Sequence, residues 1–216
     1  MSELLNENTV VPYLQKRGVI DSAATVEVLT GGVSNVVLGI KTESQDLVLK
    51  QALPQLKVKQ EWLADQRRAI VEADAMRLFH SLTPNSVPEI VDNDPEEFTV
   101  TMKRLPRNCV NWKEEMLDGR ANPIIGTRIG EILAKWHNYG ATNSQAREKF
   151  SEDKLFEQLR INPFYRAVAK LNPELTIIPE LIRENEEIKT TLVHGDFSPK
   201  NIMVTDDFHP IVLDFE

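Results

Sequence analysis

The sequence is poor in cysteine and contains no long hydrophobic run. Cys109 is the only cysteine among 216 residues, which excludes an intramolecular disulfide and a cysteine-rich zinc site. No apolar run approaches the ~18 residues needed to span a bilayer. The N-terminus also lacks the basic segment and apolar core of a secretory signal. We therefore expect a cytoplasmic protein that does not associate with a membrane.

Basic residues are scarce relative to acidic ones. The sequence has 25 lysines and arginines against 33 aspartates and glutamates, which gives a formal net charge of -8 and a pI near 5.2. Phosphate-rich surfaces attract basic proteins, so this balance argues against a general binder of nucleic acids or anionic membranes. We expect a small molecule as the partner instead.

The first part of the chain predicts a small antiparallel sheet with one long helix. Short apolar runs are separated by polar or glycine-containing turns, a pattern typical of strands. The predicted strands cover residues 26–29, 36–40, 47–50, 87–91 and 98–102. A short helix is predicted over residues 9–18, and apolar residues at helical spacing predict a longer one over residues 65–80.

After Leu105 and Pro106 the pattern becomes mainly helical. Apolar residues including Ile125, Ile129 and Trp136 form a stripe that we expect to face the core. The predicted helices cover residues 124–138, 151–161 and 179–189. The predicted extended segments that follow cover residues 191–193, 202–204 and 211–213.

The strongest chemical signal lies among these last extended segments. His194, Asp196 and Asn201 form the pattern His-x-Asp-x-x-x-x-Asn, and Asp214 ends the final strand. A hairpin would bring Asn201 and Asp214 to the same end of its two strands. Phosphoryl transfer needs oxygen ligands for a metal ion beside a carboxylate that orients the attacking hydroxyl. We therefore expect Asp196 to act as the base, and Asn201 and Asp214 to bind Mg²⁺. His194 is expected to be structural.

Lys50 is the candidate for a lysine that binds nucleotide phosphates. Strand alternation places it on the same face as Val48, which we expect to pack on adenine, while the intervening leucines face the other way. A buried lysine needs a counterion, and Glu72 in the following helix is the preferred candidate. The competing acidic residues are Glu61 and Asp74.

The turn between the first two predicted sheet strands is rich in glycine and small polar residues. Glycine permits close approach of main-chain N–H groups to a phosphate, and hydroxyl and amide side chains add donors. We expect this turn to contact the phosphates through Gly31, Gly32, Ser34 and Asn35. Two glycines between strands also occur in ordinary hairpins, and the turn matches neither the Rossmann nor the P-loop pattern.

The order of these parts resembles the protein-kinase-like fold: glycine turn, strand lysine, helix glutamate, apolar connector, then the catalytic segment. Within that fold, His194-Gly195-Asp196 and Leu213-Asp214-Phe215-Glu216 resemble the aminoglycoside phosphotransferase and choline kinase group. The resemblance implies an α+β fold with two lobes, in which residues 1–105 bind the nucleotide and residues 106–216 carry catalysis.

The same resemblance implies the ligands. ATP and Mg²⁺ would be the cofactors, and the acceptor would be a hydroxyl of a sugar, an amino sugar or an amino alcohol. The connector at residues 102–105 would hold adenine through main-chain N–H and C=O groups, with Met102 and Arg104 among the contacts.

A narrower resemblance is to the methylthioribose kinases. It rests on the segment Leu49-Lys50-Gln51-Ala52-Leu53-Pro54 and on downstream residues, namely Lys57, Trp62, Asp65, Arg67 and Glu72. The catalytic segment departs from that family, in which we expect no asparagine and an Asp-Pro-Glu sequence in place of Asp214-Phe215-Glu216.

The sequence ends at Glu216, directly after Phe215. Members of the kinase group continue with helices that complete the larger lobe and much of the acceptor site, so we expect a fragment with an incomplete second lobe. Apolar faces of residues 124–138 and of the last hairpin would then be uncovered. We expect such a chain to be poorly soluble and to have little activity by itself.

Two other functions fit parts of the pattern. A noncatalytic nucleotide-binding or interaction module would account for a chain that lacks the expected C-terminal helices. A metallohydrolase could use His194, Asp196 and Asp214, with or without His209, but it would leave the lysine and glutamate of the first lobe without a role.

Overall fold

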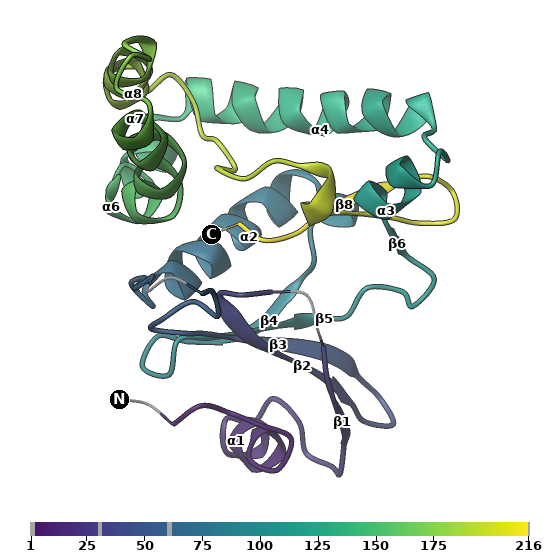
Figure 1. Cartoon of the computed structure of the whole chain (residues 1–216). Coiled ribbons are helices and arrows are strands. Elements are labelled where there is room, and N and C mark those ends of the chain that lie inside the picture. Colours follow the sequence, from purple (N-terminus) through teal and green to yellow (C-terminus); the bar gives the residue numbers. More distant parts are fainter. Residues whose placement is uncertain (1–2, 30–31, 60–61, 216) are drawn as a thin grey trace.

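The protein has two parts, one built on a sheet and one made mainly of helices. The structure is a computed structural model that describes residues 3–29, 32–59 and 62–215. Figure 1 shows a five-stranded sheet with α1 (Val10–Lys16) below it, and α2 (Arg68–Leu82) between the sheet and the remaining helices. This is the α+β arrangement with two lobes that the sequence predicts.

The sheet has the strand order β1-β2-β3-β5-β4, and all of its neighbouring strands are antiparallel. Its strands are β1 (Thr25–Val28), β2 (Asn35–Lys41), β3 (Asp46–Ala52), β4 (Ile90–Asp94) and β5 (Thr99–Lys103). Each of the five overlaps a predicted strand. The fourth begins three residues later than its predicted start at residue 87, and Pro88 near that start has no N–H to donate to a neighbouring strand.

Side chains of β3 alternate between the two faces of the sheet. Leu47 and Leu49 are buried in a cluster with Val10 and Leu14 of α1. Val48 points the other way and packs against the larger cluster that includes α2. The predicted alternation is therefore confirmed, and it directs the odd and even positions of β3 to different layers of the molecule.

An aromatic cluster joins α2 to the helical part. The ring centroid of Phe79 in α2 lies 4.4 Å from that of Trp136 in α4 (Pro123–Thr142) and 5.5 Å from that of Phe215. The indole N–H of Trp136 donates a 2.9 Å hydrogen bond to the Thr83 hydroxyl. Because all three rings are buried, the core is continuous from the sheet to the end of the last hairpin.

The helical part begins with a short strand and ends with a hairpin. Its other elements are β6 (Val110–Asn111), α3 (Trp112–Leu117), α5 (Ser144–Lys149), α6 (Lys154–Phe156), the π-helix η2 (Glu157–Arg166), α7 (Ala167–Leu171), α8 (Ile177–Glu187), the 3-10 turn η3 (Pro199–Asn201), β7 (Ile202–Val204) and β8 (Pro210–Val212). Strands β6, β7 and β8 form a three-stranded sheet. Figure 1 shows α6, α7 and α8 grouped at one end of α4.

Two predictions in this part are wrong. The segment at residues 191–193 joins neither sheet; instead the Thr191 hydroxyl donates a 2.7 Å hydrogen bond to the His137 carbonyl of α4, and the chain runs against Gly140. The helix predicted over residues 151–161 begins at Lys154 and continues as the π-helix η2, which contains Pro163. Proline lacks the N–H that α-helical pairing requires, which favours such an irregularity.

The apolar faces that we expected to be uncovered are buried. Ile125, Ile129 and Trp136 of α4 lie in the core, as do Ile202 and Val212 of the last hairpin. Large apolar side chains are exposed at several places along the chain, and those on and around α7 and α8 include Phe164, Leu171, Ile177, Leu181 and Ile188.

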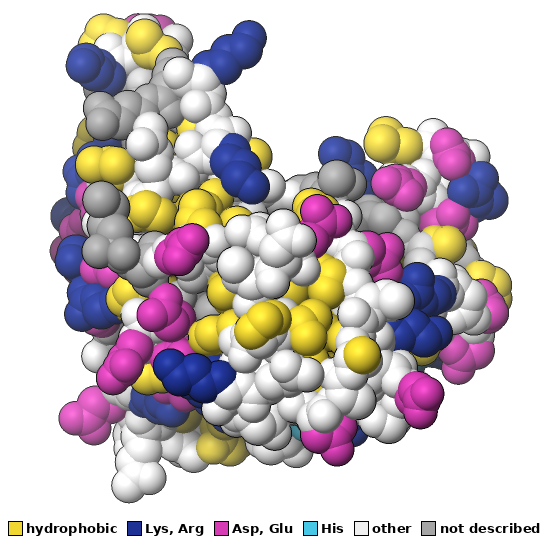
Figure 2. Space-filling view, turned by 90° about the horizontal axis from the view of Figure 1, so that it is seen from below, with side chains coloured by type: hydrophobic (Ala, Val, Ile, Leu, Met, Phe, Trp, Pro, Cys, Tyr) yellow, Lys and Arg dark blue, Asp and Glu magenta, His cyan; other side chains and the backbone are white. Residues whose placement is uncertain are grey.

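Charged side chains of both signs are interspersed on the face of the molecule that carries α1, with hydrophobic side chains gathered near its centre (Figure 2). Among the described residues, the helices are too short or too polar to cross a membrane.

Candidate active site

Lys50 lies where the two parts of the molecule meet. Its Nζ atom is 2.6 Å from Oε1 of Glu72 and 2.7 Å from Oδ1 of Asp214. Glu72 comes from α2, and its side chain is only 2% exposed. The predicted choice of Glu72 as the counterion is confirmed, because Asp74 pairs with Arg77 and Lys149 instead. Glu61 lies outside the described residues.

The contact between Lys50 and Asp214 was not predicted from the sequence. It links β3 directly to the residue that follows the last hairpin. The nearby Lys50 ammonium holds the pKa of the Asp214 carboxyl below its usual range, and this effect outweighs the opposing effect of burial. Asp214 is therefore a stable carboxylate, as a metal ligand or a partner of a cation must be.

The last hairpin brings Asn201 and Asp214 to one end, as predicted. Ile202 of β7 is paired with Val212 of β8, and the Leu213 N–H donates a 2.8 Å hydrogen bond to the Asn201 carbonyl. Asp214 has a φ of +67°. This lies in the left-handed region, which residues with a side chain seldom adopt, although asparagine and aspartate adopt it more often than most. Such conformations cost about 1–3 kcal/mol and cluster at functional sites.

Asn201 offers an oxygen to a metal ion. Its Nδ2 atom donates a 3.0 Å hydrogen bond to the Asp196 carbonyl, which leaves the amide oxygen as the possible ligand.

No group of three or more histidine, cysteine, aspartate or glutamate side chains among the described residues could hold a metal ion. His209 lies at the opposite end of the hairpin from Asp214, where its Nε2 contacts the Ser86 hydroxyl at 3.0 Å. Among the described residues, the metal site that a metallohydrolase would build from His194, Asp196 and Asp214, with or without His209, is therefore not formed.

Asp196 follows Gly195, whose φ of +82° requires the conformational freedom of glycine. Two cations contact Oδ2 of Asp196: Nζ of Lys200 at 2.8 Å and Nη2 of Arg160 at 3.3 Å. No described residue donates a hydrogen bond to the other carboxylate oxygen, Oδ1. The arrangement holds one carboxylate oxygen and leaves the second without a hydrogen-bond donor among the described residues. Ser198, two residues later, has a buried hydroxyl without a partner among the described residues.

His194 is buried and holds the segment that contains Asp196 and Asn201 against the core. Its Nε2 lies 3.0 Å from the Leu213 carbonyl, and its ring lies 4.6 Å from Phe215 and 5.7 Å from Phe197 between centroids. Burial lowers the pKa of His194, so the imidazole is neutral at pH 7. These contacts agree with the predicted structural role, because they tie the catalytic segment to the end of the hairpin.

The glycine turn is anchored through its main chain. The Ser34 carbonyl accepts hydrogen bonds from the Leu53 N–H at 2.9 Å and from Nη2 of Arg68 at 2.5 Å. Asn35 donates from Nδ2 to the Ser34 hydroxyl at 3.0 Å. Gly32 has open space around its Cα, so packing does not demand glycine there. Gly31 lies outside the described residues.

Arg68 is a fully buried arginine at the start of α2. Besides Ser34, its guanidinium donates to the main-chain carbonyls of Leu53, Ala64 and Asp65. It therefore connects the helix that carries Glu72 with the glycine turn and the end of β3.

Val48 and Met102 are paired neighbours on β3 and β5, and Gly39 of β2 is the partner of Val48 on its other side. Cross-strand partners share a face of a sheet, so these positions form one row. A Cβ atom on Gly39 would lie 2.8 Å from Nη1 of Arg104, so the Arg104 side chain covers the glycine. Its guanidinium also pairs with Glu27 of β1.

The connector after β5 has few free N–H groups. The Lys103 N–H donates to the Glu89 carbonyl and the Arg104 N–H to the Asp46 carbonyl, both at 2.9 Å. The Leu105 N–H donates to no described residue. A main-chain contact with adenine would therefore use carbonyl groups together with the Leu105 N–H.

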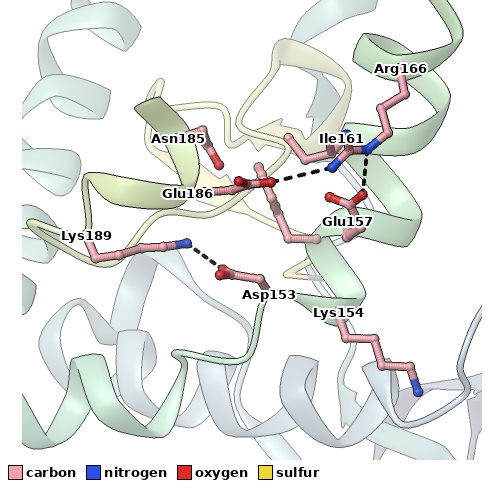
Figure 3. A pocket seen from close by; sticks show the side chains of 9 residues that line it. Asp153, Lys154, Glu157, Ile161, Arg166, Asn185, Glu186 and Lys189 are labelled. Atoms are coloured by element: carbon pink, nitrogen blue, oxygen red, sulfur yellow. Dashed lines mark hydrogen bonds and ion pairs between the residues drawn. The ribbon is translucent and has the colours of Figure 1, made fainter. Parts of the chain in front are cut away.

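One surface hollow lies away from these residues. Figure 3 shows it between the segment 153–166 and the end of α8, with a volume of about 450 Å³. Its charged side chains are already paired: Lys189 with Asp153 at 2.5 Å, and Arg166 with Glu157 at 2.7 Å. Because the chemistry-bearing residues do not line it, we do not assign the site to this hollow.

Sequence reasoning missed three cations of the site. Lys200 lies inside the catalytic motif, and its i,i+4 spacing from Asp196 could have identified it. Arg68 lies one turn before Glu72 on the same helix face, which was a weaker signal. Arg160 is 36 residues away from Asp196, and nothing in its local pattern indicates the contact.

Comparison with known sequences gives the family. Residues 25–216 match the model of a phosphotransferase enzyme family. Among curated proteins, the methylthioribose kinase of Bacillus mycoides (strain KBAB4) is 29% identical over 133 residues, which are 60% of this chain and 34% of that protein. The chain thus spans about a third of the length of this relative.

Solved structures give the fold. A choline kinase from Streptococcus pneumoniae superposes with a TM-score of 0.56 at 13% identity, covering 97% of this chain and 69% of that one. A macrolide 2'-phosphotransferase from Brachybacterium faecium has a TM-score of 0.57 at 18% identity, covering 96% and 71%. The predicted resemblance to small-molecule kinases is confirmed, and the match over residues 25–216 shows that the chain belongs to the phosphotransferase enzyme family.

Proposed function

We propose that the chain forms the ATP-binding and catalytic part of a kinase that transfers the γ-phosphate of ATP to a hydroxyl of a small molecule. The observation that carries the proposal is the position of Lys50, which contacts Glu72 of α2 and Asp214 of the catalytic hairpin at once. A cation held between two lobes is suited to bind phosphate groups that lie between them. The family match and the kinase names of the relatives support the same chemistry.

We assign residues 1–105 to the nucleotide and residues 106–216 to catalysis. Val48 and Met102 would contact adenine, whose edge would meet the connector at Arg104 and Leu105. Gly31, Gly32, Ser34 and Asn35 would approach the phosphates from the turn before β2. A structure of the choline kinase from Streptococcus pneumoniae in complex with AMP, which has a TM-score of 0.53, supports a nucleotide site in this fold.

Asn201 and Asp214 fit Mg²⁺. Both offer hard oxygen atoms, and the amide nitrogen of Asn201 is occupied by the Asp196 carbonyl, so its oxygen faces away from that bond. Mg²⁺ is commonly bound by one or two protein ligands together with phosphate oxygens and water, so two protein ligands suffice. When bound, the ion would neutralise charge that develops on the transferred phosphate.

Asp196 would act as the base. The acceptor hydroxyl would hydrogen-bond to Oδ1, while Lys200 and Arg160 keep Oδ2 in place. As the hydroxyl oxygen forms its bond to the γ-phosphorus, the bond from that phosphorus to the oxygen of ADP breaks, and the hydroxyl proton passes to Asp196. Because the transition state is loose, Asp196 contributes mainly by aligning the nucleophile.

The test is ATP binding by the protein encoded by the complete reading frame, measured by calorimetry with and without Mg²⁺. We expect Mg²⁺ to strengthen binding and Lys50→Ala to weaken it at least about tenfold, which corresponds to about 1.4 kcal/mol. Lys149→Ala, which removes an exposed lysine of α5 that pairs with Asp74, should bind ATP as the wild type does.

Two outcomes would contradict the proposal. Absence of ATP binding would remove the nucleotide site. ATP binding without phosphate transfer to any of a panel of sugars, amino sugars and amino alcohols would favour the noncatalytic nucleotide-binding module.

A further inference from the structure

Arg160 is held in place by three groups at once. Its Nε donates a 3.0 Å hydrogen bond to the Gly195 carbonyl, and its Nη1 donates one of 3.0 Å to the Leu159 carbonyl. Its Nη2 lies 3.3 Å from Oδ2 of Asp196. The side chain is only 18% exposed, so these contacts are partly shielded from water. An arginine fixed in this way has little freedom to serve as a mobile surface charge.

The guanidinium spans the main chain and the side chain of the catalytic segment. Adjacent nitrogen atoms contact the carbonyl just before Asp196 and the carboxylate of Asp196 itself. A planar guanidinium presents such donors in a fixed fork, which a lysine ammonium cannot do. Lys200 also contacts Oδ2, but its side chain is 54% exposed and belongs to the same short segment. Arg160 is thus the contact that fixes Asp196 from outside its own loop.

The helix that carries Arg160 is itself attached to the sheet part. Gln158 accepts hydrogen bonds from Nε1 of Trp62 at its carbonyl, at 3.3 Å, and from the Asp65 N–H at its side chain, at 3.2 Å. Lys154 pairs with the Asp65 carboxylate at 3.1 Å. In Figure 1 this segment lies beside the start of α2, on the side away from the connector that follows β5. Residues 154–160 therefore form a further link between the lobes.

We propose that Arg160 is a positioning residue for the base Asp196, and that the segment 154–160 makes the orientation of this carboxylate depend on the placement of the sheet lobe. Arg160 keeps Oδ2 engaged, so that Oδ1 faces the acceptor hydroxyl. The inference rests on the proposed role of Asp196. It predicts that loss of Arg160 slows transfer without weakening nucleotide binding, because Lys50, Val48 and Met102 lie on the sheet.

The test uses the protein encoded by the complete reading frame and measures steady-state phosphate transfer. We expect Arg160→Ala to lower kcat by about 10- to 100-fold, the scale seen when supporting contacts are lost, with the KM for ATP changed less than about threefold. Arg160→Lys should recover little of this loss, because it cannot contact Gly195 and Asp196 together. Non-denaturing guanidinium should restore part of the activity of Arg160→Ala.

Arg166→Ala is the matched control. Arg166 lies on the same π-helix, but it pairs with Glu157 and Glu186 on the surface. We expect its kcat to be unchanged and guanidinium to have no effect. Retention of full kcat by a folded Arg160→Ala or Arg160→Lys variant would overturn the proposal, as would an equal loss in Arg166→Ala.

The Asp196→Asn variant separates this inference from the proposed function. If wild type transfers phosphate and Asp196→Asn does not, the base is established, and the Arg160 variants judge the positioning role alone. If Asp196→Asn keeps full turnover, Asp196 is not the base and the role of Arg160 falls with it. Should Arg160→Ala fail to fold, the Lys variant still decides, since a folded Lys variant at full kcat contradicts the proposal.

Discussion

Lys50 and Asp214 lie 2.7 Å apart although 164 positions separate them in the sequence. Their contact joins the central strand of the sheet to the residue that follows the last hairpin. Glu72 approaches the same ammonium from α2, so three elements meet at one cation. The two halves of the candidate site are therefore in direct contact through Lys50, and nucleotide phosphates that bind Lys50 would compete with Asp214 for it.

Replacing Lys50 by methionine should destabilise the protein by about 3 kcal/mol. The change removes the Lys50 partner of Glu72, whose side chain is buried, and breaking a buried ion pair costs far more than breaking a surface one. Lys103→Met is the control, because its pair with Glu89 is exposed and should be worth less than about 1 kcal/mol. Urea unfolding of both variants measures the difference. Equal losses would contradict the claim that the Lys50 pair is a buried interaction.

The ion pair of Lys50 and Glu72 is one of the features that the sequence could predict. Alternation along β3 and helical spacing in α2 are local patterns, and they were enough to pair Lys50 with Glu72. The hairpin geometry of Asn201 and Asp214 followed in the same way from a turn between two apolar runs. Each inference needed only neighbouring residues and the periodicity of one element.

Contacts between distant segments were not predictable in this way. Arg160 meets Asp196 from a π-helix, and neither the helix type nor its placement follows from local spacing. Strand β6 has only two residues and exists through its pairing with β7. The segment at residues 191–193 has the apolar character of a strand, but it docks on α4 because Gly140 leaves room for it.

Replacing Arg68 by alanine should loosen the glycine turn. The partly buried carbonyl of Ser34 and the buried carbonyl of Leu53 would each lose a charged donor, so we expect a loss of stability of about 2–3 kcal/mol and weaker ATP binding. Arg67→Ala is the control, since Arg67 is exposed and pairs with Asp65 on the surface. Urea unfolding and ATP calorimetry on both variants provide the measurement. Unchanged ATP affinity in a stable Arg68→Ala variant would show that the turn does not depend on this anchor.

Replacing Gly140 by alanine should disturb the approach to the catalytic segment. The new Cβ atom would lie 2.6 Å from the Leu192 main-chain nitrogen and 2.5 Å from the Thr191 hydroxyl, so the main chain must move. Overpacking of this kind costs about 1–3 kcal/mol. Gly130→Ala in the same helix meets open space and should stabilise by up to about 1 kcal/mol. Thermal unfolding of the Gly140→Ala and Gly130→Ala variants measures the difference. Stabilisation in both variants would contradict the close approach of Thr191 and Leu192 to Gly140.

Acid should weaken the protein partly through His194. Burial holds its pKa below the ordinary value of 6.5, so the unfolded chain takes up a proton more readily than the folded one. The stability that neutral His194 contributes to the folded protein is thus fully present above about pH 6.5. It is lost as the pH falls through the lower pKa that His194 has in the folded state. Between about pH 7.5 and pH 5, the unfolding free energy of wild type should fall more than that of His194→Gln. Parallel curves would show that His194 does not titrate differently on folding.

The central claim is that Asp196 is the base of a phosphate transfer from ATP. The most direct measurement is the transfer rate from ATP to a hydroxyl acceptor, compared between wild type and Asp196→Asn, with ATP affinity measured on the same samples. The account predicts equal affinity and a rate lower by at least about 100-fold, because the amide cannot accept the hydroxyl proton. Equal rates in the two proteins would contradict it.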